Sequence, residues 1–408
     1  MRKVLTDGTD AAAINRPWVV VDGVLRIALL LYFHEMGYGP LQLALLLACP
    51  QVLSAITQAA TGRFAVSSKV GIAAQLPLLL QITALAMLIF PGDTLNLSWA
   101  LAAQAISGIA GNLGQRRSRA VFTAAPGRAV PTTLPDWFAR LAHSGYALLG
   151  TGFFLGGSLL SLFGLQATLG IVVAALGAMA LLEYWQATGP VNSSAPHGAL
   201  AEEPQLTLQT GVLSAARFLL GAREVCLAVA VPVHLATAYG WSHAAVGSYL
   251  ALWLFVVGAT QIMTPWLIAA TGYAAARWAA LLAAVPLLIA VSPGADSFPG
   301  YEVLGGLPLP ELSLAGGLLL FAALFAINIV AQDRLANYFA SRRKDAAPNT
   351  GLFLPEALGR MGGTLLSGWL YQTESLAACL LFSALCLALM STLLLALPGP
   401  AQASQRRT

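Results

Sequence analysis

The chain has 408 residues, of which 58% are hydrophobic and only 9% are charged. Soluble globular proteins carry about 25% charged residues, so this composition excludes a water-soluble globular domain. The formal net charge of +4 needs no nucleic-acid partner, because basic residues at the inner ends of membrane spans, beside anionic lipid headgroups, account for it.

Long apolar runs recur along the chain from about Pro17 to Leu397. A helix of about 20 apolar residues crosses the hydrocarbon core with its backbone hydrogen bonds satisfied internally. The residues ahead of the first run carry Asp7 and Asp10 and lack an apolar core, so we expect no signal peptide. The runs predict an all-α polytopic membrane protein with twelve spans, at 17–34, 41–61, 70–90, 98–115, 137–161, 166–186, 211–235, 243–264, 276–291, 313–334, 351–371 and 376–397.

Basic residues fall on one side of these spans. None of the 21 Lys and Arg residues lies in the six connections that the twelve spans assign to the outer side. The outer connections carry only acids, namely Glu35, Asp93, Asp296, Glu302, Glu311 and Glu374. Because Lys and Arg are concentrated in cytoplasmic connections, this asymmetry predicts a multi-pass protein of the bacterial inner membrane with both termini in the cytoplasm.

Two six-residue strings indicate an internal repeat. Gly-Gly-Ser-Leu-Leu-Ser at 156–161 returns as Gly-Gly-Thr-Leu-Leu-Ser at 362–367, about half a chain length later, and Gly-Tyr-Gly-Pro at 37–40 has a counterpart in Gly-Trp-Ser-His at 240–243. Many secondary transporters are duplications of this kind, with a substrate site between the halves. We predict six-helix bundles at 1–186 and 211–408, joined by a polar cytoplasmic linker at 187–210. The outer segment 292–312, rich in Pro and Gly, is predicted to be irregular.

Several charged residues lie inside the predicted spans, where each costs a few kcal/mol unless it faces the protein interior or water. Span 1 carries Asp22 and Arg26 and span 11 carries Glu356 and Arg360, and each pair is four residues apart on one helical face.

Span 7 carries Arg217, Arg223 and Glu224. Arg217 and Glu224 are seven residues apart, which places them on the same face of an α-helix. Spans 1, 7 and 11 thus hold four arginines against three acids.

Twelve spans in two halves with cytoplasmic ends resemble the major facilitator superfamily. Its loop between spans 2 and 3 normally reads Gly-x-x-x-Asp-Arg-x-Gly-Arg/Lys, and here Gly62, Arg63 and Lys69 match it while Val66 replaces the acid. Gly62, Arg63 and Lys69 are therefore the predicted gating loop, which lacks the usual acid of this motif. Gly152 to Gly157 resembles an element of the superfamily's antiporters, with Phe153 in place of proline; close helix packing also explains these glycines.

In that superfamily spans 1, 4, 7 and 10 line a central cavity, so the resemblance implies that Arg26 and Arg223 face each other across it. A guanidinium presents two parallel donors that match carboxylate, phosphate or arsenate oxygens, which favours an anionic substrate. Alternatively, each arginine is neutralised by a neighbouring acid and only ties helices together. Asp22, Glu224 and Glu356 are the candidate proton carriers, since an anion that engages the arginine would favour protonation of the acid.

Longer strings narrow the resemblance to the organoarsenical efflux permeases. They include Asp-Gly-Val-Leu-Arg at 22–26, Gly-Ala-Arg-Glu-Val at 221–225, Phe-Ala-Ile-Asn at 325–328 and the run 359–372. The family exports an arsenylated phosphoglycerate made by a partner glyceraldehyde-3-phosphate dehydrogenase and so confers arsenate resistance, and the resemblance implies that substrate here. The predicted substrate-binding residues are Arg26, Arg217, Arg223, Arg360 and Asn328.

Two cavity helices depart from that family, in the segments 111–119 and 329–334, so export of another phosphorylated or carboxylated metabolite or of a drug stays open. A non-transporting sensor and a membrane-embedded enzyme are the alternatives of a different class. No nucleophile motif, phosphate loop or metal-ligand spacing occurs in the sequence. We therefore expect a monomeric non-enzyme in the lipid bilayer, with no cofactor and no metal.

The charge asymmetry makes a topological prediction. Reporter fusions at Thr408 and within the 187–210 linker should both give a cytoplasmic signal, because the six outer connections of this assignment contain no Lys or Arg. Alkaline phosphatase and green fluorescent protein fusions at the two sites measure this. An external signal from either fusion would overturn the twelve-span assignment.

Overall fold

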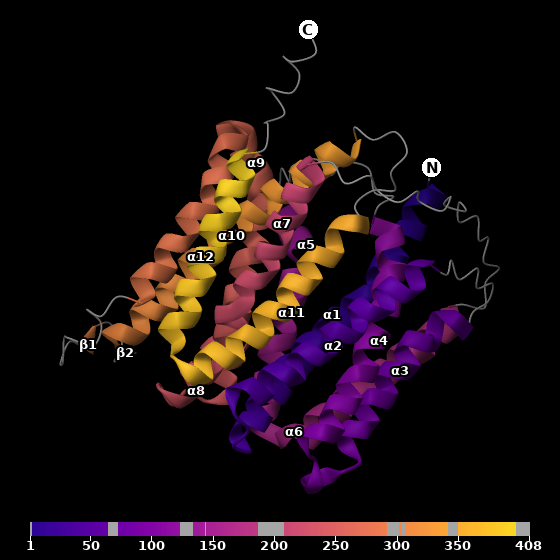
Figure 1. The fold of residues 1–408 in the computed structure, drawn as a ribbon. Coiled ribbons are helices and arrows are strands. Elements are labelled where there is room, and N and C mark those ends of the chain that lie inside the picture. The colour runs from indigo at the N-terminus through magenta and orange to yellow at the C-terminus, as the bar shows by residue number, and fades with distance from the viewer. Residues whose placement is uncertain are drawn as a thin grey trace. The chain divides into compact units, whose positions relative to one another are not determined.

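The computed structural model describes residues 2–63, 72–122, 134–142, 144–186, 208–291, 302–303, 307–341 and 350–396. Almost all of them are helical (Figure 1). The helices are α1 (Arg2–Glu35), α2 (Pro40–Arg63), α3 (Ile72–Ile89), η1 (Gly92–Thr94), α4 (Leu97–Phe122), α5 (Leu134–Ala142), α6 (Gly145–Gln186), α7 (Leu208–Ala222), η2 (Arg223–Val225), η3 (Cys226–Ala230), α8 (Val231–Thr237), α9 (His243–Val291), α10 (Leu309–Ser341), α11 (Thr350–Thr373) and α12 (Leu376–Ala396).

The predicted all-α membrane fold is confirmed. Each of the twelve predicted spans coincides with helical structure over its described residues, except at Phe90, which is a turn, and at Ser144, where predicted span 5 passes from α5 to α6. Six stretches within the described residues have both the length and the hydropathy to cross a membrane, and 76–89 and 278–290 are shorter apolar helices. The six stretches are Pro40–Thr57, Gly145–Leu181, Gly211–Thr237, His243–Pro265, Glu311–Arg334 and Leu376–Leu395.

Three local features differ from the predicted boundaries. Predicted spans 5 and 6 join within α6 at Gly164, where φ is 75° and ψ is 176°, a backbone conformation that glycine adopts without strain. Helix α9 continues through the predicted connection at 265–275, which contains the strong helix former alanine. The segment predicted to be irregular contains a small antiparallel hairpin of β1 (Glu302–Val303) and β2 (Leu307–Pro308).

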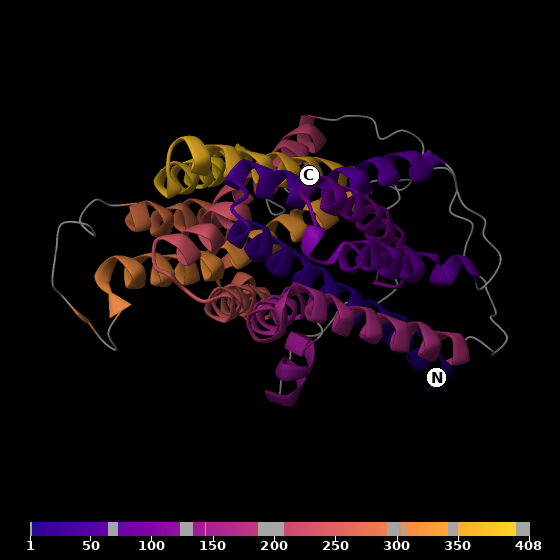
Figure 2. The same cartoon turned by 90° about the horizontal axis from the view of Figure 1, so that it is seen from below.

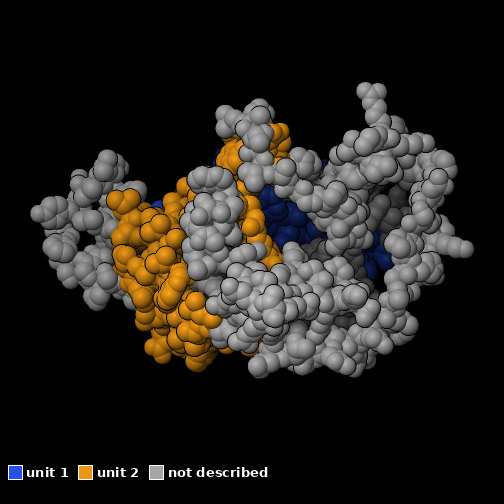
Figure 3. Space-filling view, turned by 90° about the horizontal axis from the view of Figure 1, so that it is seen from above, with its two compact units in different colours: residues 1–131, 142–197, 241–251 blue, residues 132–141, 198–240, 252–408 orange. Residues whose placement is uncertain are grey.

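The chain separates into two compact units (Figure 3). Unit 1 comprises residues 1–131, 142–197 and 241–251, and unit 2 comprises 132–141, 198–240 and 252–408. Helix α9 therefore begins in unit 1 and continues in unit 2. The predicted division into 1–186, 187–210 and 211–408 stays a prediction.

Within unit 1, glycines bring helices into backbone contact. A Cβ added to Gly23 of α1 would lie 2.9 Å from the Cα of Gly152 in α6, and one added to Gly156 would lie 2.8 Å from the carbonyl oxygen of Val24. A Cβ on Gly157 would lie 3.0 Å from the Cα of Gly247, in the unit 1 part of α9. The antiporter-like glycines of α6 therefore have a packing role, as small residues commonly do between membrane helices.

Within unit 2, the corresponding contact joins α7 and α11, which lie side by side (Figures 1 and 2). A Cβ on Gly221 would lie 2.5 Å from the backbone nitrogen of Arg360, and one on Gly363 would lie 2.5 Å from the carbonyl oxygen of Ala222. Gly359 meets the backbone of Phe218 equally closely. Because the backbones of α7 and α11 lie this close, side chains of one helix can contact those of the other directly.

Two adjacent glycines of α11 test this packing. Gly363→Ala should lower the melting temperature of the purified protein, because its methyl group meets only backbone atoms of α7 and forces the helices apart. Gly362→Ala is the matched control: an added Cβ there meets nothing within 4 Å, and alanine favours the helix. Overpacking of this kind costs about 1–3 kcal/mol. Equal melting temperatures for the two variants would contradict the observed contact.

Candidate functional site

The candidate site lies in unit 2, where the chain leaves regular α-helical geometry after Ala222. Helix α7 passes into the 3₁₀ turn η2, then into the π-helix η3, and returns to α geometry in α8. Single π turns inside helices are rare and often occur at functional sites. Two charged residues of the sequence-predicted site, Arg223 and Glu224, form this junction.

Two serines support the irregular backbone. The Oγ of Ser383 in α12 donates to the carbonyl oxygen of Arg223 at 2.9 Å and accepts from the backbone nitrogen of Cys226 at 3.2 Å. The Oγ of Ser367 in α11 accepts from the backbone nitrogens of Val229 and Ala230 at 3.3 and 3.2 Å. Both serine side chains are buried, so they satisfy backbone groups at a depth where water is excluded.

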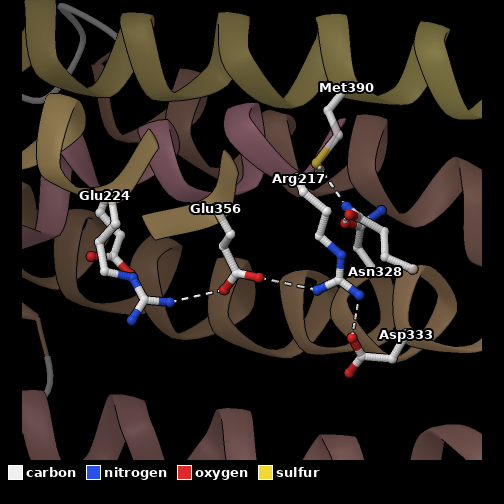
Figure 4. Close-up of polar contacts among 8 residues, drawn as sticks. Arg217, Glu224, Asn328, Asp333, Glu356 and Met390 are labelled. Carbon is white, nitrogen blue, oxygen red and sulfur yellow. Dashed lines mark hydrogen bonds and ion pairs between the residues drawn. The ribbon is translucent and has the colours of Figure 1, made fainter. Parts of the chain in front are cut away.

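A chain of ion pairs crosses the site (Figure 4). Arg217 of α7 binds Asp333 of α10 through Nη2, and its Nη1 donates to Glu356 Oε2 of α11 at 3.2 Å. The other oxygen of Glu356 accepts from Arg360 Nη2 at 2.9 Å, and Arg360 Nε lies 3.1 Å from Glu224 Oε1. The five side chains thus alternate in charge from one end to the other.

Glu356 occupies the middle of this chain and is shared by two guanidinium groups. Its side chain is 19% exposed, and that of Arg217 is 8% exposed. Buried charges are tolerated when they are paired and hydrogen-bonded, and removing one partner leaves the other uncompensated. The carboxylate of Glu356 therefore holds α7 and α11 together electrostatically at the place where their glycines bring the backbones into contact.

Arg223 lies beside this chain and contacts aromatic rings. Its Cζ is 3.2 Å from the ring centroid of Phe325 and 5.9 Å from that of Phe321, both in α10. The residue is 4% exposed. Stacking on an aromatic face is a favourable way to hold a guanidinium away from water, and it leaves the plane of the group fixed.

Asn328 and Gln332, one turn apart in α10, form a buried amide pair. Gln332 Nε2 donates to Asn328 Oδ1 at 2.9 Å and lies 2.9 Å from the sulfur of Met390 in α12. Neither residue is exposed. Among the described residues, Asn328 Nδ2 and Gln332 Oε1 have no hydrogen-bond partner. These two residues therefore carry an unused donor and an unused acceptor in the interior of unit 2.

The ion-pair chain joins four of the six predicted site residues of unit 2, namely Arg217, Glu224, Glu356 and Arg360. Arg223 adjoins Glu224 in the sequence, and Asn328 lies in α10 with Asp333. The predicted pairing of Glu356 with Arg360 is confirmed. Arg217 and Glu224, placed on one face by their seven-residue spacing, both pair with residues of α11, Arg217 with Glu356 and Glu224 with Arg360.

Asp333 is the site residue that the sequence reasoning missed. It occurs in the predicted span 10 as an acid at membrane depth, which by itself marks a functional candidate. Arg217 therefore pairs with two acids, Asp333 and Glu356. Asp333 of α10 supplies the fourth acid that balances the four arginines of spans 1, 7 and 11. The helix-tethering interpretation of the arginines is accordingly supported for Arg217 and Arg360.

In unit 1, the predicted pair of Asp22 and Arg26 is confirmed, with Arg26 Nε donating to Asp22 Oδ2 at 2.9 Å. These side chains are 44% and 33% exposed, so the pair is accessible. Of the predicted gating loop, Gly62 and Arg63 end α2 and Lys69 lies outside the described residues. In the described part of the chain, no three or more His, Cys, Asp or Glu side chains are grouped to hold a metal ion.

Comparison with known proteins identifies the fold. No family model and no curated protein sequence matches the chain. Solved structures do match: a bacterial homologue of the iron transporter ferroportin in an inward-facing state, with a TM-score of 0.67 at 16% identity, covers 96% of this chain and 98% of its own. A bacterial metal transporter (TM-score 0.62, 17% identity) and the nucleoside transporter NupG (0.65, 11%) each cover 95% of this chain, and the match spans 97% and 98% of their own lengths.

These likenesses extend over nearly the whole chain. The chain therefore has the same fold as these solved transporters, an all-α polytopic membrane fold.

The central carboxylate gives a stability prediction. Glu356→Gln should destabilise the purified protein by about 3 kcal/mol, because two guanidinium groups lose a shared counter-ion inside the membrane. Glu374→Gln, an exposed acid in the same unit, should change the melting temperature little. Thermal unfolding in detergent, followed by circular dichroism, measures both. A Glu356→Gln protein as stable as Glu374→Gln would show that the ion-pair chain does not hold these helices together.

Proposed function

We propose that this chain is a secondary active transporter that exports a small organic anion from the cytoplasm by alternating access, in a process coupled to protons. The observation that carries the proposal is the chain of alternating carboxylate and guanidinium groups at membrane depth in unit 2, within a transporter fold. Intramembrane charges of this kind mark substrate and ion pathways in membrane proteins.

An organic anion suits the guanidinium groups of the site. The Cζ of Arg223 lies over the ring of Phe325, and a planar guanidinium binds carboxylate, phosphate or arsenate through two parallel hydrogen bonds. The accessible Arg26 of unit 1 provides a second such group. The resemblance to organoarsenical efflux permeases specifies the substrate further as arsenylated phosphoglycerate, which combines a carboxylate with phosphate-like groups.

Coupling to protons follows from the acids that accompany the arginines. Each arginine with a described ion pair has a carboxylate within 3.2 Å. When an anion binds such an arginine, the ion pair between the arginine and its acid is weakened. In a low-dielectric environment the acid that has lost its partner is then more stable in the protonated, neutral form. Substrate binding and protonation therefore reinforce each other. Asp22, Glu224 and Glu356 are proposed for this role along with Asp333.

A second candidate is export of another phosphorylated or carboxylated metabolite. The departure of segments 111–119 and 329–334 from the organoarsenical family favours it. In the first of these segments, Asn112 of α4 is buried and its amide donates to the carbonyl oxygen of Ser54 in α2. This side chain is used for helix packing. The test below separates the two substrates, and it also separates transport from sensing or catalysis.

The test uses cells that lack their own arsenic exporters. Expression together with a glyceraldehyde-3-phosphate dehydrogenase should restore growth on arsenate and lower cell arsenic, because the dehydrogenase supplies the exported anion. Expression without the dehydrogenase should protect little. Equal protection against arsenite would indicate a different pump, and counterflow of labelled 3-phosphoglycerate in liposomes without arsenate protection would indicate the metabolite exporter. Chemical alteration of the labelled compound would indicate an enzyme, and no flux of any anion would overturn the proposal.

The same assays test Arg223. Arg223→Lys should insert and fold normally but lose at least nine-tenths of transport, because lysine keeps the charge and loses the two-point donation. Arg343→Ala is the control, since the sequence places Arg343 in a cytoplasmic connection, where one solvated charge contributes little. Counterflow at the unmodified rate and affinity by Arg223→Lys would refute direct recognition at Arg223.

A further inference from the structure

On the edge of the Arg217 guanidinium formed by Nε and Nη2, only Nη2 has a hydrogen-bond partner among the described residues. The Nη1 group donates to Glu356 and the Nη2 group binds one oxygen of Asp333. The Nε group, which shares the side-on edge of the fork with Nη2, is buried and has no hydrogen-bond partner in the described residues. Because the Arg217 side chain is only 8% exposed, bulk water does not readily satisfy this donor, and a buried donor without a partner is unfavourable.

Asp333 is the partner that Arg217 can release most easily. It lies at the end of the ion-pair chain and has Arg217 as its one ion-pair partner among the described residues, whereas Glu356 is held by two arginines. The Asp333 side chain is 53% exposed, against 19% for Glu356. Asp333 is therefore less enclosed by protein than Glu356, and releasing it breaks one ion pair where releasing Glu356 breaks two.

We propose that the edge formed by Nε and Nη2 of Arg217 binds the exported anion through two oxygens of one carboxylate, phosphate or arsenate group. In the absence of substrate, Asp333 occupies half of this edge. When the anion takes both donors, Asp333 is displaced and binds a proton, so that one negative charge replaces another at Arg217. This inference rests on the function proposed above and deepens it by naming the exchange position and its competing acid.

The surroundings of Asp333 are compatible with this exchange. The charged groups that face it in the described part of the chain are Arg217 from α7 and Glu356 from α11, and Arg334 follows it in α10. Helix α12 contributes the uncharged Met390 next to Gln332. After displacement, Glu356 still neutralises Arg217 in part. The two oxygens of the anion then accept from both Nε and Nη2 of Arg217, whereas the single oxygen of Asp333 accepts from Nη2 alone.

The test measures binding and proton uptake together on the purified full-length protein. Calorimetry with 3-phosphoglycerate and with inorganic phosphate, in two buffers of different ionisation enthalpy, gives the affinity and the number of protons taken up. Asp333→Asn should bind 3-phosphoglycerate at least threefold more tightly and take up fewer protons, because a neutral amide competes less well for the arginine and cannot be protonated. Arg217→Lys should bind at least tenfold more weakly, since it lacks the two-donor edge.

Glu374→Gln removes an exposed carboxylate of the same unit and should match the unmodified protein in both quantities. The inference is wrong when the unmodified protein binds the anion but Asp333→Asn shows the same affinity and the same proton uptake. An Arg217→Lys protein that keeps its fold and its affinity would also overturn it. Absence of binding of either probe to the unmodified protein would instead remove the proposed function, and the inference with it.

Discussion

The carboxylate of Glu356, shared between Arg217 and Arg360, is the interaction on which the charged interior of unit 2 depends. Arginine and glutamate enter a hydrocarbon environment only at considerable cost, and each charge here is acceptable because the next one neutralises it. The backbone contact at Gly221 and Gly363 makes this possible. It brings α7 and α11 close enough for short, direct ion pairs, so small residues and charged residues in these helices serve one arrangement.

The irregular junction after α7 places the two neighbouring charged residues in different surroundings. Arg223 stacks on Phe325, whereas Glu224 turns to Arg360. The following π-helix leaves backbone groups in altered positions, and Ser367 and Ser383 hydrogen-bond to them. A regular α-helix would need no such support from neighbouring helices. The energy spent on this local geometry is consistent with a functional site rather than with a purely structural helix.

Local spacing predicted what lies within one helix and failed between helices. The pairs Asp22–Arg26 and Glu356–Arg360 follow from the four-residue rule and form as expected. The partnership of Arg217 with Asp333 joins residues far apart in sequence, and no periodicity encodes it. The repeated string also has two outcomes: Ser367 is buried and supports η3, while its counterpart Ser161 is exposed. The repeat predicted the duplicated spans, and the different roles of its copies arise from their neighbours.

Charge balance links the two parts of the proposed function. The ion-pair chain contains two guanidinium groups and three carboxylates, with the Arg223 guanidinium nearby on its aromatic support. An anion that joined this arrangement with every acid ionised would add uncompensated negative charge at low dielectric, where Coulomb energies are large. Protonation of one displaced acid removes that penalty. Coupling to protons therefore needs no separate group in the protein, because it follows from moving an anion through a site whose arginines are already paired with acids.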